Sequence, residues 1–247
     1  MFKLFSGIAK AINRIKNGGV SAVILCAGAS TRFSDSENKQ LAMINGASVI
    51  ERTLSVFENC KSIDEIVLVV RKEDTEKYKN FVCEKEYNKV KCIVVGGETR
   101  QASALKGFKH VSDKTKYVAI HDGARCLITE KMIEDVLRDA TKYGIATAAS
   151  KITDTVKVAD RDGFISKTLD REYIWNVQTP QIFEYKKYQI SAYKAKQDGI
   201  IATDDCMLAE NAGFKVKLVN TGNENIKITV KDDINRAEAI LLQRGVN

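Results

Sequence analysis

Short apolar runs alternate with helix-like segments along most of this chain, and this alternation restricts its fold more than any other feature. Runs such as VSAVILCA at 20–27 and DEIVLVV at 64–70 are mostly apolar, as in strands that are buried on both faces. The segment 48–60 between them carries apolar residues at helical spacing. Strands that alternate with helices form a mostly parallel, twisted sheet with helices on both faces. We therefore predict an α/β protein with a three-layer, Rossmann-like core.

The same alternation continues as far as Gly144. Further strands are expected at 89–97 and 116–125, and further helices at 73–87, 99–111 and 129–144. Thr129 is placed to cap the start of the last of these helices, and Gly144 is placed to end it. Both residues make the boundaries of this helix the best defined in the chain.

The alternation breaks after Gly144. Residues 146–183 alternate in places like a strand, turn at Asp162-Gly163 and alternate again, which predicts a projecting β-hairpin or arm at about 151–173. After it, we expect helices at 184–199 and 203–213, strands at 215–222 and 225–229, and a closing helix at 231–244. Thr229 and Asp232 have capping-box spacing at the start of the closing helix.

The first 19 residues, MFKLFSGIAKAINRIKNGG, precede the first predicted strand. Their apolar residues fall on one helical face beside four cations, which is typical of a helix that docks on a membrane surface or on a partner. The alternative, which we expect, is a helix packed on its own domain or a loose extension. The segment lacks the long apolar stretch of a signal peptide. We therefore divide the chain into an N-terminal amphipathic extension at 1–19 and one domain at 20–247.

The bulk composition narrows the class of protein only slightly. The chain of 247 residues is 44% hydrophobic and 29% charged, as in soluble globular proteins, and its net charge of +7 favours an anionic ligand. We expect no nucleic acid partner, and no apolar run reaches the roughly 18 residues of a membrane span. The six cysteines form no CxxC pair and there are two histidines, so we expect reduced cysteines in a cytoplasmic protein without a Cys/His metal cage.

Three loops follow predicted strands, at the position where ligands bind in such sheets. They are CAGASTR at 26–32, VGGETRQAS at 95–103 and HDGAR at 121–125. The first loop leaves backbone N–H groups unobstructed on small residues, and Arg32 and Lys39 add two cations. It matches neither GxGxxG nor GxxxxGK[ST], which argues against a dinucleotide-binding dehydrogenase and a P-loop ATPase. From its residues alone, it is either a phosphate cradle or a tight turn with two solvated cations.

Several motifs together resemble one enzyme family. GASTR followed by KQ resembles the nucleotidyltransferase signature AAGxGxRMxxxxPKQ. GGETRQAS, HDGAR, TDTVK, LDR, TPQIF, TDD and NIKIT follow in the order found in the 2-C-methyl-D-erythritol 4-phosphate cytidylyltransferases of non-mevalonate isoprenoid precursor biosynthesis. This resemblance covers residues 20 to about 244. It implies transfer of CMP from CTP to 2-C-methyl-D-erythritol 4-phosphate, release of pyrophosphate, and Mg²⁺ or another divalent cation as cofactor.

The resemblance also implies roles for individual residues. The residues implied to be catalytic are Arg32, Lys39, Arg171 and Lys227. Those implied to bind CTP are Ala27, Gly28, Ala29, Ser30, Gly97, Glu98, Ser103, Asp122, Gly123 and Ala124. Those implied to bind the acceptor are Arg125, Thr155, Arg171 and Lys227. The metal would be held mainly by the phosphates of CTP, with Asp122 as the candidate protein ligand.

The predicted arm has a special place in this resemblance. In the family the arm crosses to the partner of a homodimer, so Thr155 and Arg171 would complete the neighbouring site. A hairpin without a core of its own needs such a partner. The resemblance therefore implies a homodimer that is joined through the arm.

The chain departs from the family pattern at a few positions. Asn38 and Cys126 stand where proline is usual, and Ser30-Thr31 replace a glycine-and-basic pair. We expect the two missing prolines to loosen their loops, because proline fixes φ and reduces the freedom of the unfolded chain. Arg100 is either a site cation or a structural residue, and we expect His121 to be a strand residue with a satisfied ring.

Other functions stay open at this stage. A cytidylyltransferase for another polyol phosphate, such as ribitol 5-phosphate, shares nearly the same motifs. A non-catalytic nucleotide-binding regulator would keep the fold and lose turnover, but all four predicted catalytic cations are present, which favours an enzyme. An interaction protein that docks on membranes through residues 1–16 is a third class.

Overall fold

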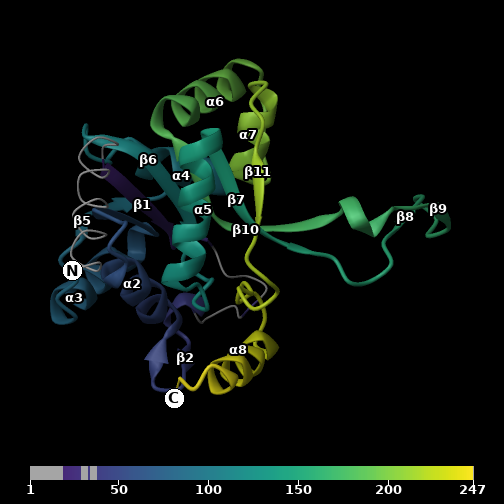
Figure 1. Cartoon of the computed structure of the whole chain (residues 1–247). Helices are drawn as coiled ribbons and strands as arrows, with labels where there is room; N and C mark the ends of the chain where they lie inside the picture. The colour runs from purple at the N-terminus through teal and green to yellow at the C-terminus, as the bar shows by residue number, and fades with distance from the viewer. Residues whose placement is uncertain (1–18, 29–32, 34–37, 247) are drawn as a thin grey trace, which may run out of the picture.

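The computed structural model describes residues 19–28, 33 and 38–246, and its centre is a seven-stranded sheet. Its strands are β1 (Gly19–Leu25), β4 (Glu65–Val70), β5 (Val90–Val95), β6 (Thr115–Asp122), β7 (Ile145–Lys151), β10 (Trp175–Glu184) and β11 (Lys217–Asn220). Their order across the sheet is β11-β7-β10-β6-β1-β4-β5. Neighbouring strands are parallel, except that β10 runs antiparallel to both β6 and β7. The predicted, mostly parallel sheet is confirmed (Figure 1).

Helices cover both faces of the sheet, as predicted. One face packs against α2 (Val49–Asn59), α3 (Thr75–Glu84) and α5 (Glu130–Tyr143). The other packs against α4 (Arg100–Phe108), α6 (Tyr185–Gln197) and α7 (Asp205–Asn211). Besides the two strands of the arm, the remaining described elements are the ribbon of β2 (Met43–Ile44) and β3 (Ala47–Ser48), the short helices η1 (Lys39–Leu41), η2 (Lys72–Asp74) and η3 (Arg171–Tyr173), and α8 (Asp232–Gln243).

The strand pattern explains why two cores form. Along β1, Ala22 and Ile24 lie in the core under α2 and α5, whereas Val23 and Leu25 lie in the core under α4 and α6. Successive side chains of a strand point to opposite faces, so an apolar run of this kind supplies both cores at once. The three layers hold the carboxyl ends of β1, β5 and β6 in one rigid edge.

The predicted ends of α5 are confirmed. The Thr129 hydroxyl accepts a hydrogen bond from the backbone N–H of Met132, which satisfies a donor in the first turn. Gly144 ends the helix with φ of 89°, a left-handed conformation in which glycine carries no steric cost.

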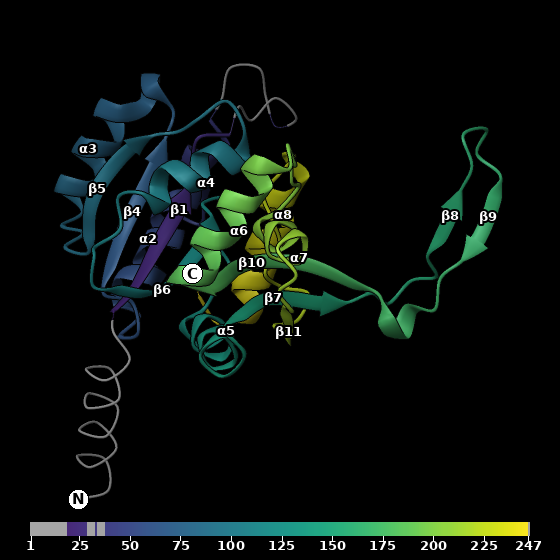
Figure 2. The same cartoon turned by 90° about the horizontal axis from the view of Figure 1, so that it is seen from above.

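The arm projects from the body in both views (Figures 1 and 2). Its outer strands, β8 (Lys157–Ala159) and β9 (Ile165–Thr168), pair with each other and turn through Gly163. The predicted bounds of the arm, about 151–173, lie between the end of β7 and the start of β10. Both of these are strands of the central sheet, and their side chains pack into its cores.

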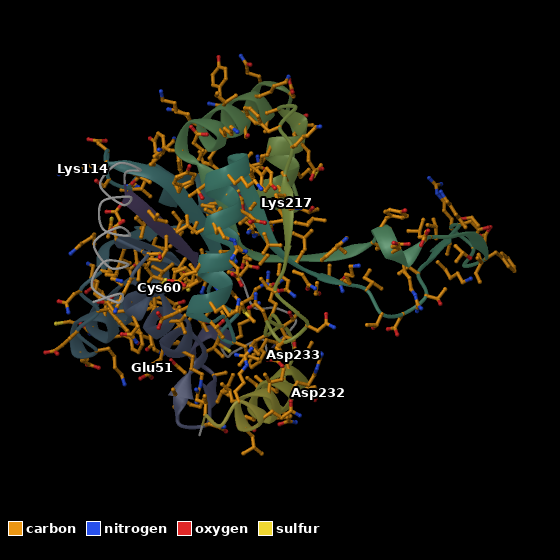
Figure 3. The ribbon with its side chains drawn as sticks, viewed as in Figure 1. Glu51, Cys60, Lys114, Lys217, Asp232 and Asp233 are labelled. Carbon is orange, nitrogen blue, oxygen red and sulfur yellow. The ribbon has the colours of Figure 1, made fainter. Side chains whose placement is uncertain are left out.

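Two predictions near the C-terminus are wrong. Residues 225–229 form no strand, and the segment is held by single contacts such as the bond from the Ile228 N–H to the Ala124 carbonyl at 2.8 Å. The capping box of Thr229 and Asp232 is also absent. Instead, the carboxylate of the next residue, Asp233, accepts through Oδ2 from the N–H groups of Thr229 at 2.8 Å and Val230 at 3.0 Å. Figure 3 labels Asp232 and Asp233 on α8.

Residues 1–18 lie outside the described part of the chain, so the division at residue 19 stays a prediction. Within the described part, no helix has the length and apolar character needed to cross a membrane. All six cysteines of the chain are described, and all are free thiols, as expected.

Candidate active site

The loops at the carboxyl ends of β1, β5 and β6 surround a cavity of about 370 Å³, called here the edge pocket. Its lining residues are Leu25, Ala27, Gly28, Lys39, Gln40, Gly97, Glu98, Thr99, Arg100, Ser103, Asp122, Ala124, Lys227 and Thr229. Most of the residues predicted to bind CTP thus meet in one cavity. Gly123 lies just behind it, where a side chain would overlap Cys26. Ala29, Ser30 and Arg32 lie outside the described residues.

The turn after β5 is built around glycine. The Gly97 N–H donates to Ser103 Oγ at 3.0 Å, and the same hydroxyl lies 3.3 Å from the Gly97 carbonyl oxygen. A Cβ atom on Gly97 would lie 2.5 Å from the Cβ of Ala102, so the turn cannot hold a larger residue in this position. Ser103 and the start of α4 therefore fix a bare stretch of backbone against the cavity.

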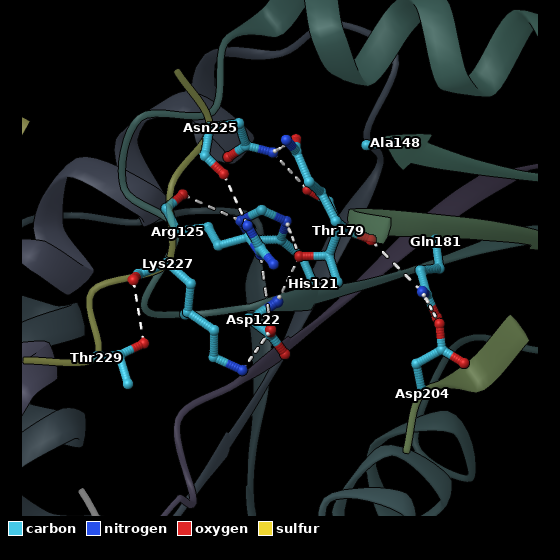
Figure 4. Close-up of polar contacts among 12 residues, drawn as sticks. His121, Asp122, Arg125, Ala148, Thr179, Gln181, Asp204, Asn225, Lys227 and Thr229 are labelled. Carbon is cyan, nitrogen blue, oxygen red and sulfur yellow. Dashed lines mark hydrogen bonds and ion pairs between the residues drawn. The ribbon is translucent and has the colours of Figure 1, made fainter. Parts of the chain in front are cut away.

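Asp122, the last residue of β6, is the buried acidic centre of the site (Figure 4). Its carboxylate lies 2.8 Å from Lys227 Nζ, 3.2 Å from Arg100 Nε and 3.8 Å from Arg125 Nε. Burial alone would raise the pKa of Asp122, but the positive charges of Arg100, Lys227 and Arg125 outweigh burial and hold this pKa well below its usual range. Asp122 is therefore ionised and gathers three cations at the floor of the pocket.

Arg100 joins Asp122 to a second buried carboxylate. Its Nη1 lies 2.6 Å from Asp205 Oδ2, and the Tyr188 hydroxyl donates to the other oxygen of Asp205 at 2.9 Å. Burial would lower the pKa of Arg100, but the two carboxylates raise it above its usual value. Arg100 lines the pocket and also links α7 to β6. Of the two roles considered from the sequence, a site cation or a structural residue, this arrangement favours the structural one.

The prediction that His121 has a satisfied ring is confirmed. The ring is fully buried, with Nδ1 at 3.0 Å from Thr179 Oγ1 and Nε2 at 3.3 Å from the Arg125 carbonyl oxygen. The Thr179 hydroxyl accepts from the Asp122 N–H at 3.0 Å, so its own proton is free for His121 Nδ1. Burial lowers the pKa of His121 to about 3, which keeps the ring neutral. His121 is therefore a neutral ring whose two nitrogens both contact other groups of the protein, and it links Thr179 to the Arg125 backbone.

A second cavity of about 480 Å³, called here the side pocket, lies at the base of the arm. Its lining residues are Arg125, Ser150, Lys151, Ile152, Thr153, Asp154, Asn176, Val177, Gln178, Asn223, Asn225, Ile226, Lys227, Asp233 and Arg236. Four of these residues are Arg or Lys, which suits an anionic ligand. Lys227 lines both the edge pocket and the side pocket, so the two cavities meet at its side chain.

The segment that carries Lys227 is held by a buried amide that the sequence prediction missed. Asn225 is fully buried, and its Nδ2 donates to the Thr179 carbonyl at 2.8 Å and to Gln178 Oε1 at 3.1 Å. These bonds replace the strand pairing that was expected there. The available signal was a pair of amides, Gln178 and Asn225, within segments that otherwise resemble strands.

The arm residues stand apart from both pockets. Thr155 and Arg171 are exposed and line neither cavity of their own chain, and Arg171 Nη1 donates to the Thr153 carbonyl at 2.7 Å. Of the four residues predicted to be catalytic, Lys39 and Lys227 meet in the edge pocket, Arg171 lies on the arm, and Arg32 is outside the described residues.

The described residues contain no group of three or more His, Cys, Asp or Glu that could hold a metal ion. Asp122 and Glu98 are the carboxylates among the lining residues of the edge pocket. Mg²⁺ is commonly held by one or two carboxylates together with substrate phosphates. Asp122 therefore fits a divalent cation that arrives with phosphates, and the described residues do not form a cage that would hold one alone.

Comparisons with known proteins agree with this geometry. Residues 20–243 match the family model described as 2-C-methyl-D-erythritol 4-phosphate cytidylyltransferase. The protein of that name from Caldanaerobacter subterraneus subsp. tengcongensis is 44% identical over 223 residues, which are 90% of this chain and 98% of that protein. The one from Clostridium acetobutylicum is 38% identical over 226 residues, 91% of this chain and 98% of that protein.

Solved structures show the same fold. The 4-diphosphocytidyl-2C-methyl-D-erythritol synthase of Anaerococcus prevotii superposes with a TM-score of 0.81 at 32% identity and covers 92% of this chain and 98% of its own. The 2-C-methyl-D-erythritol 4-phosphate cytidylyltransferase of Thermus thermophilus has a TM-score of 0.74 at 26% identity and covers 90% of this chain and 98% of its own.

Proposed function

Because this chain belongs to the 2-C-methyl-D-erythritol 4-phosphate cytidylyltransferase family, we propose that its edge pocket binds CTP and its side pocket binds the acceptor. The chain is a nucleotidyltransferase that transfers CMP from CTP to 2-C-methyl-D-erythritol 4-phosphate and releases pyrophosphate, a step in the synthesis of isoprenoid precursors. We assign CTP and the acceptor to adjacent pockets because Lys227 lines both, so the two substrates would meet at its side chain.

The reaction explains why the site is rich in cations. An oxygen of the acceptor phosphate attacks the α-phosphorus of CTP, a new P–O bond forms, and the bond to the β-phosphate oxygen breaks as pyrophosphate leaves. The attacking oxygen is already anionic, so the step needs no general base. It needs positive charge and fixed donors, which bring two anions together and stabilise the charge that develops in the transition state. A neutral His121 and an ionised Asp122 agree with this requirement.

We assign the cations by the pocket in which they lie. Lys39, with Arg32 of the same loop, would hold the α-phosphate of CTP, and Lys227 would bridge the two substrates at the junction of the pockets. Arg125 would bind the acceptor phosphate, since a planar guanidinium matches phosphate oxygens in pairs. The backbone of Ala27-Gly28-Ala29-Ser30 would donate to the triphosphate.

The opposite wall of the edge pocket suits the nucleoside. The bare backbone of Gly97 and the hydroxyl of Ser103 would meet the cytosine edge, with Glu98 beside them. Asp122 would face the ribose and the metal, while Gly123 and Ala124 complete this wall. When bound, Mg²⁺ neutralises charge on the phosphate oxygens of CTP, and Asp122 is the residue that would help to hold it.

The arm supports a homodimer as the working form. Arg171 and Thr155 are exposed and line neither pocket of their own chain, so we infer that they complete the side pocket of a second copy. The cysteines are all free, which supports an enzyme that works in the reducing cytoplasm.

The proposal is tested by a pyrophosphate-release assay. The purified chain is supplied with CTP and Mg²⁺ and with either 2-C-methyl-D-erythritol 4-phosphate or ribitol 5-phosphate. Release with the first acceptor and little with the second is the expected result. Pyrophosphate release with ribitol 5-phosphate alone would show that ribitol 5-phosphate is the acceptor. No pyrophosphate release with either compound would exclude this transferase activity. Lys39→Ala should lower turnover by about 10²-fold or more, and Lys215→Ala, an exposed lysine outside both pockets, serves as the matched control.

A further inference from the structure

Lys39 owes its position to a turn that begins at Asn38. The turn is the short helix η1, in which the Leu41 N–H donates to the Asn38 carbonyl at 2.9 Å and the Ala42 N–H donates to the Lys39 carbonyl at 3.3 Å. The side chain of Asn38 caps this turn, because its Oδ1 accepts from the Gln40 N–H at 3.1 Å. Lys39 is 9% exposed and lines the edge pocket, so a small rotation of the turn would move its ammonium group within that pocket.

The other end of the Asn38 side chain contacts a different element. Its Nδ2 donates to Asp74 Oδ2 at 2.9 Å, across 36 positions of sequence. Asp74 follows β4 in η2, and Arg71 holds the same carboxylate oxygen at 2.7 Å through both Nε and Nη2. The Asp74 side chain is 13% exposed, so this bond is shielded from water. A hydrogen bond to an ionised acceptor is about twice as strong as a neutral one.

Asparagine is the residue type that satisfies both contacts together. Its amide accepts at one atom and donates at the other, whereas an aspartate could accept but not donate, and alanine could do neither. Proline would match the observed φ of −78° but would offer neither bond. The expectation that the missing proline loosens this loop stays a prediction. In the described structure the Asn38 amide supplies a tertiary restraint where proline would supply a local one.

We propose that Asn38 is a positioning residue for Lys39, which ties the Lys39 turn to the rigid end of β4 through Asp74 and Arg71. This proposal rests on the function proposed for Lys39 in the edge pocket. Asn38 itself is not among the residues that line the pocket, so its effect on turnover passes through the orientation of its neighbour.

The test measures steady-state kinetics for Asn38→Ala and Asp74→Ala. Each should lower kcat by about 10-fold while the KM for CTP changes by less than about 3-fold, because a misplaced catalytic group loses rate rather than binding. Glu73→Ala is the matched control, since Glu73 also contacts Arg71, at 3.4 Å, but is exposed and does not contact Asn38 in the described structure. It should keep the wild-type kcat.

A reversed pair separates positioning from general destabilisation. Asn38→Asp alone sets two carboxylates against each other and should lose at least as much kcat as Asn38→Ala. Combined with Asp74→Asn, it restores a donor and an acceptor in reverse, and kcat should recover to within about 3-fold of wild type. Equal kcat in Asn38→Ala and wild type, or a double variant no better than its worse parent, would overturn the proposal.

Hydrogen exchange keeps this result independent of the proposed activity. The N–H groups of Gln40, Leu41 and Ala42 should exchange at least about 10-fold faster in Asn38→Ala than in wild type or in Glu73→Ala. If the wild-type chain released no pyrophosphate, the transferase assignment would fail, yet faster exchange in Asn38→Ala would still support the role of Asn38 in holding the turn. If the wild-type chain turned over normally and exchange in Asn38→Ala were unchanged, only the role of Asn38 would be refuted.

Discussion

At the scale of single residues, the site is organised by one buried carboxylate. Asp122 attracts Lys227, Arg100 and Arg125, and the attraction is strong because the carboxylate is 7% exposed and poorly screened by water. The three cations have different tasks. Arg100 also contacts Asp205, whereas the side chain of Lys227 is a third exposed. Asp122 therefore holds a partly exposed cation at the junction of the two pockets, where we propose that this cation meets a phosphate.

Replacing Lys227 tests this view. Lys227→Met keeps the unbranched side chain as far as its Cε and removes the charged group, so kcat should fall by about 10²-fold to 10³-fold, as when one stabilising donor is lost from a transition state. Lys215→Met, an exposed lysine outside both pockets, should keep normal turnover. Steady-state pyrophosphate release measures both. A Lys227→Met enzyme within about 3-fold of wild type would remove Lys227 from the chemistry.

His121 predicts a pH dependence of stability. Its pKa is about 3 in the folded protein and about 6.5 when unfolded, so between these values the unfolded state binds the extra proton. Stability should therefore fall as the pH drops from about 7 to 4, with a contribution of up to about 1.4 kcal/mol per pH unit from this residue. Asp122, whose pKa is depressed, adds its own loss only below about pH 4.

The measurement is urea denaturation of the metal-free protein from pH 7 to pH 4. His121→Gln should flatten the slope of unfolding free energy against pH, even though it lowers stability at pH 7. His110→Gln changes the other histidine of the chain, which is exposed, and should leave the slope as it is. Equal slopes in wild type and His121→Gln would contradict a neutral, buried ring.

At the scale of elements, the close approach of α4 to the sheet positions the nucleoside wall. Gly107 faces Val23 of β1 and Val69 of β4, and a Cβ atom there would overlap both side chains. The first turn of the same helix carries Arg100 and Ser103, which reach Asp122 and Gly97. The distance between helix and sheet is thus part of the site, and a glycine in the last turn of α4 sets it.

Gly107→Ala should therefore destabilise the protein in spite of the higher helix propensity of alanine. We expect a loss of about 1–3 kcal/mol in the free energy of unfolding, which is typical of overpacking. Asn80→Ala on the exposed face of α3 is the control and should gain a few tenths of a kcal/mol from propensity, by a rough estimate. Urea denaturation compares them, and a Gly107→Ala protein as stable as wild type would show that the helix can move outward without cost.

In the molecule as a whole, the arm is the feature whose exposed apolar residues are not covered within a single chain. Phe164 is 72% exposed, Ile165 66% and Tyr173 75%, so the arm offers apolar side chains to water. β8 and β9 pair with each other and with no other described strand. A two-stranded hairpin of this kind is marginal by itself and gains stability from a partner surface. This supports the proposed homodimer, in which each arm completes the other site.

Mixing two inactive variants tests the crossed arm. Lys39→Ala inactivates the body of one copy and Arg171→Ala inactivates the arm of the other, so a mixed dimer contains one site with both residues intact. Random exchange of subunits should then restore about a quarter of the wild-type activity. Pyrophosphate release after co-refolding measures it. If the arm acted on its own chain, the mixture would stay inactive, and the proposed exchange of arms would be wrong.

The layers of the fold and the position of the site could be predicted from the amino-acid sequence. Periodicity separates buried strands such as 64–70 from amphipathic helices such as α5, and both signals are local, so they could be read without a structure. The rule that ligands bind at the carboxyl ends of parallel strands then located the loops that now line the edge pocket. The site residues outside the described part and the crossed arm stay predictions.

Which polar side chains meet depends on the folded chain and could not be predicted from local patterns. Arg100 finds Asp205 across 105 positions, Asn225 replaces the strand pairing expected at 225–229, and Asn38 reaches Asp74 across 36. β10 likewise enters the sheet antiparallel between two strands that the local pattern could not order. The physical reason is common to all of these cases. Periodicity indicates which side of a helix or strand is apolar, and it is a local signal. A buried charge or amide needs a hydrogen-bond partner, and that partner can lie anywhere in the sequence because the fold brings the two together.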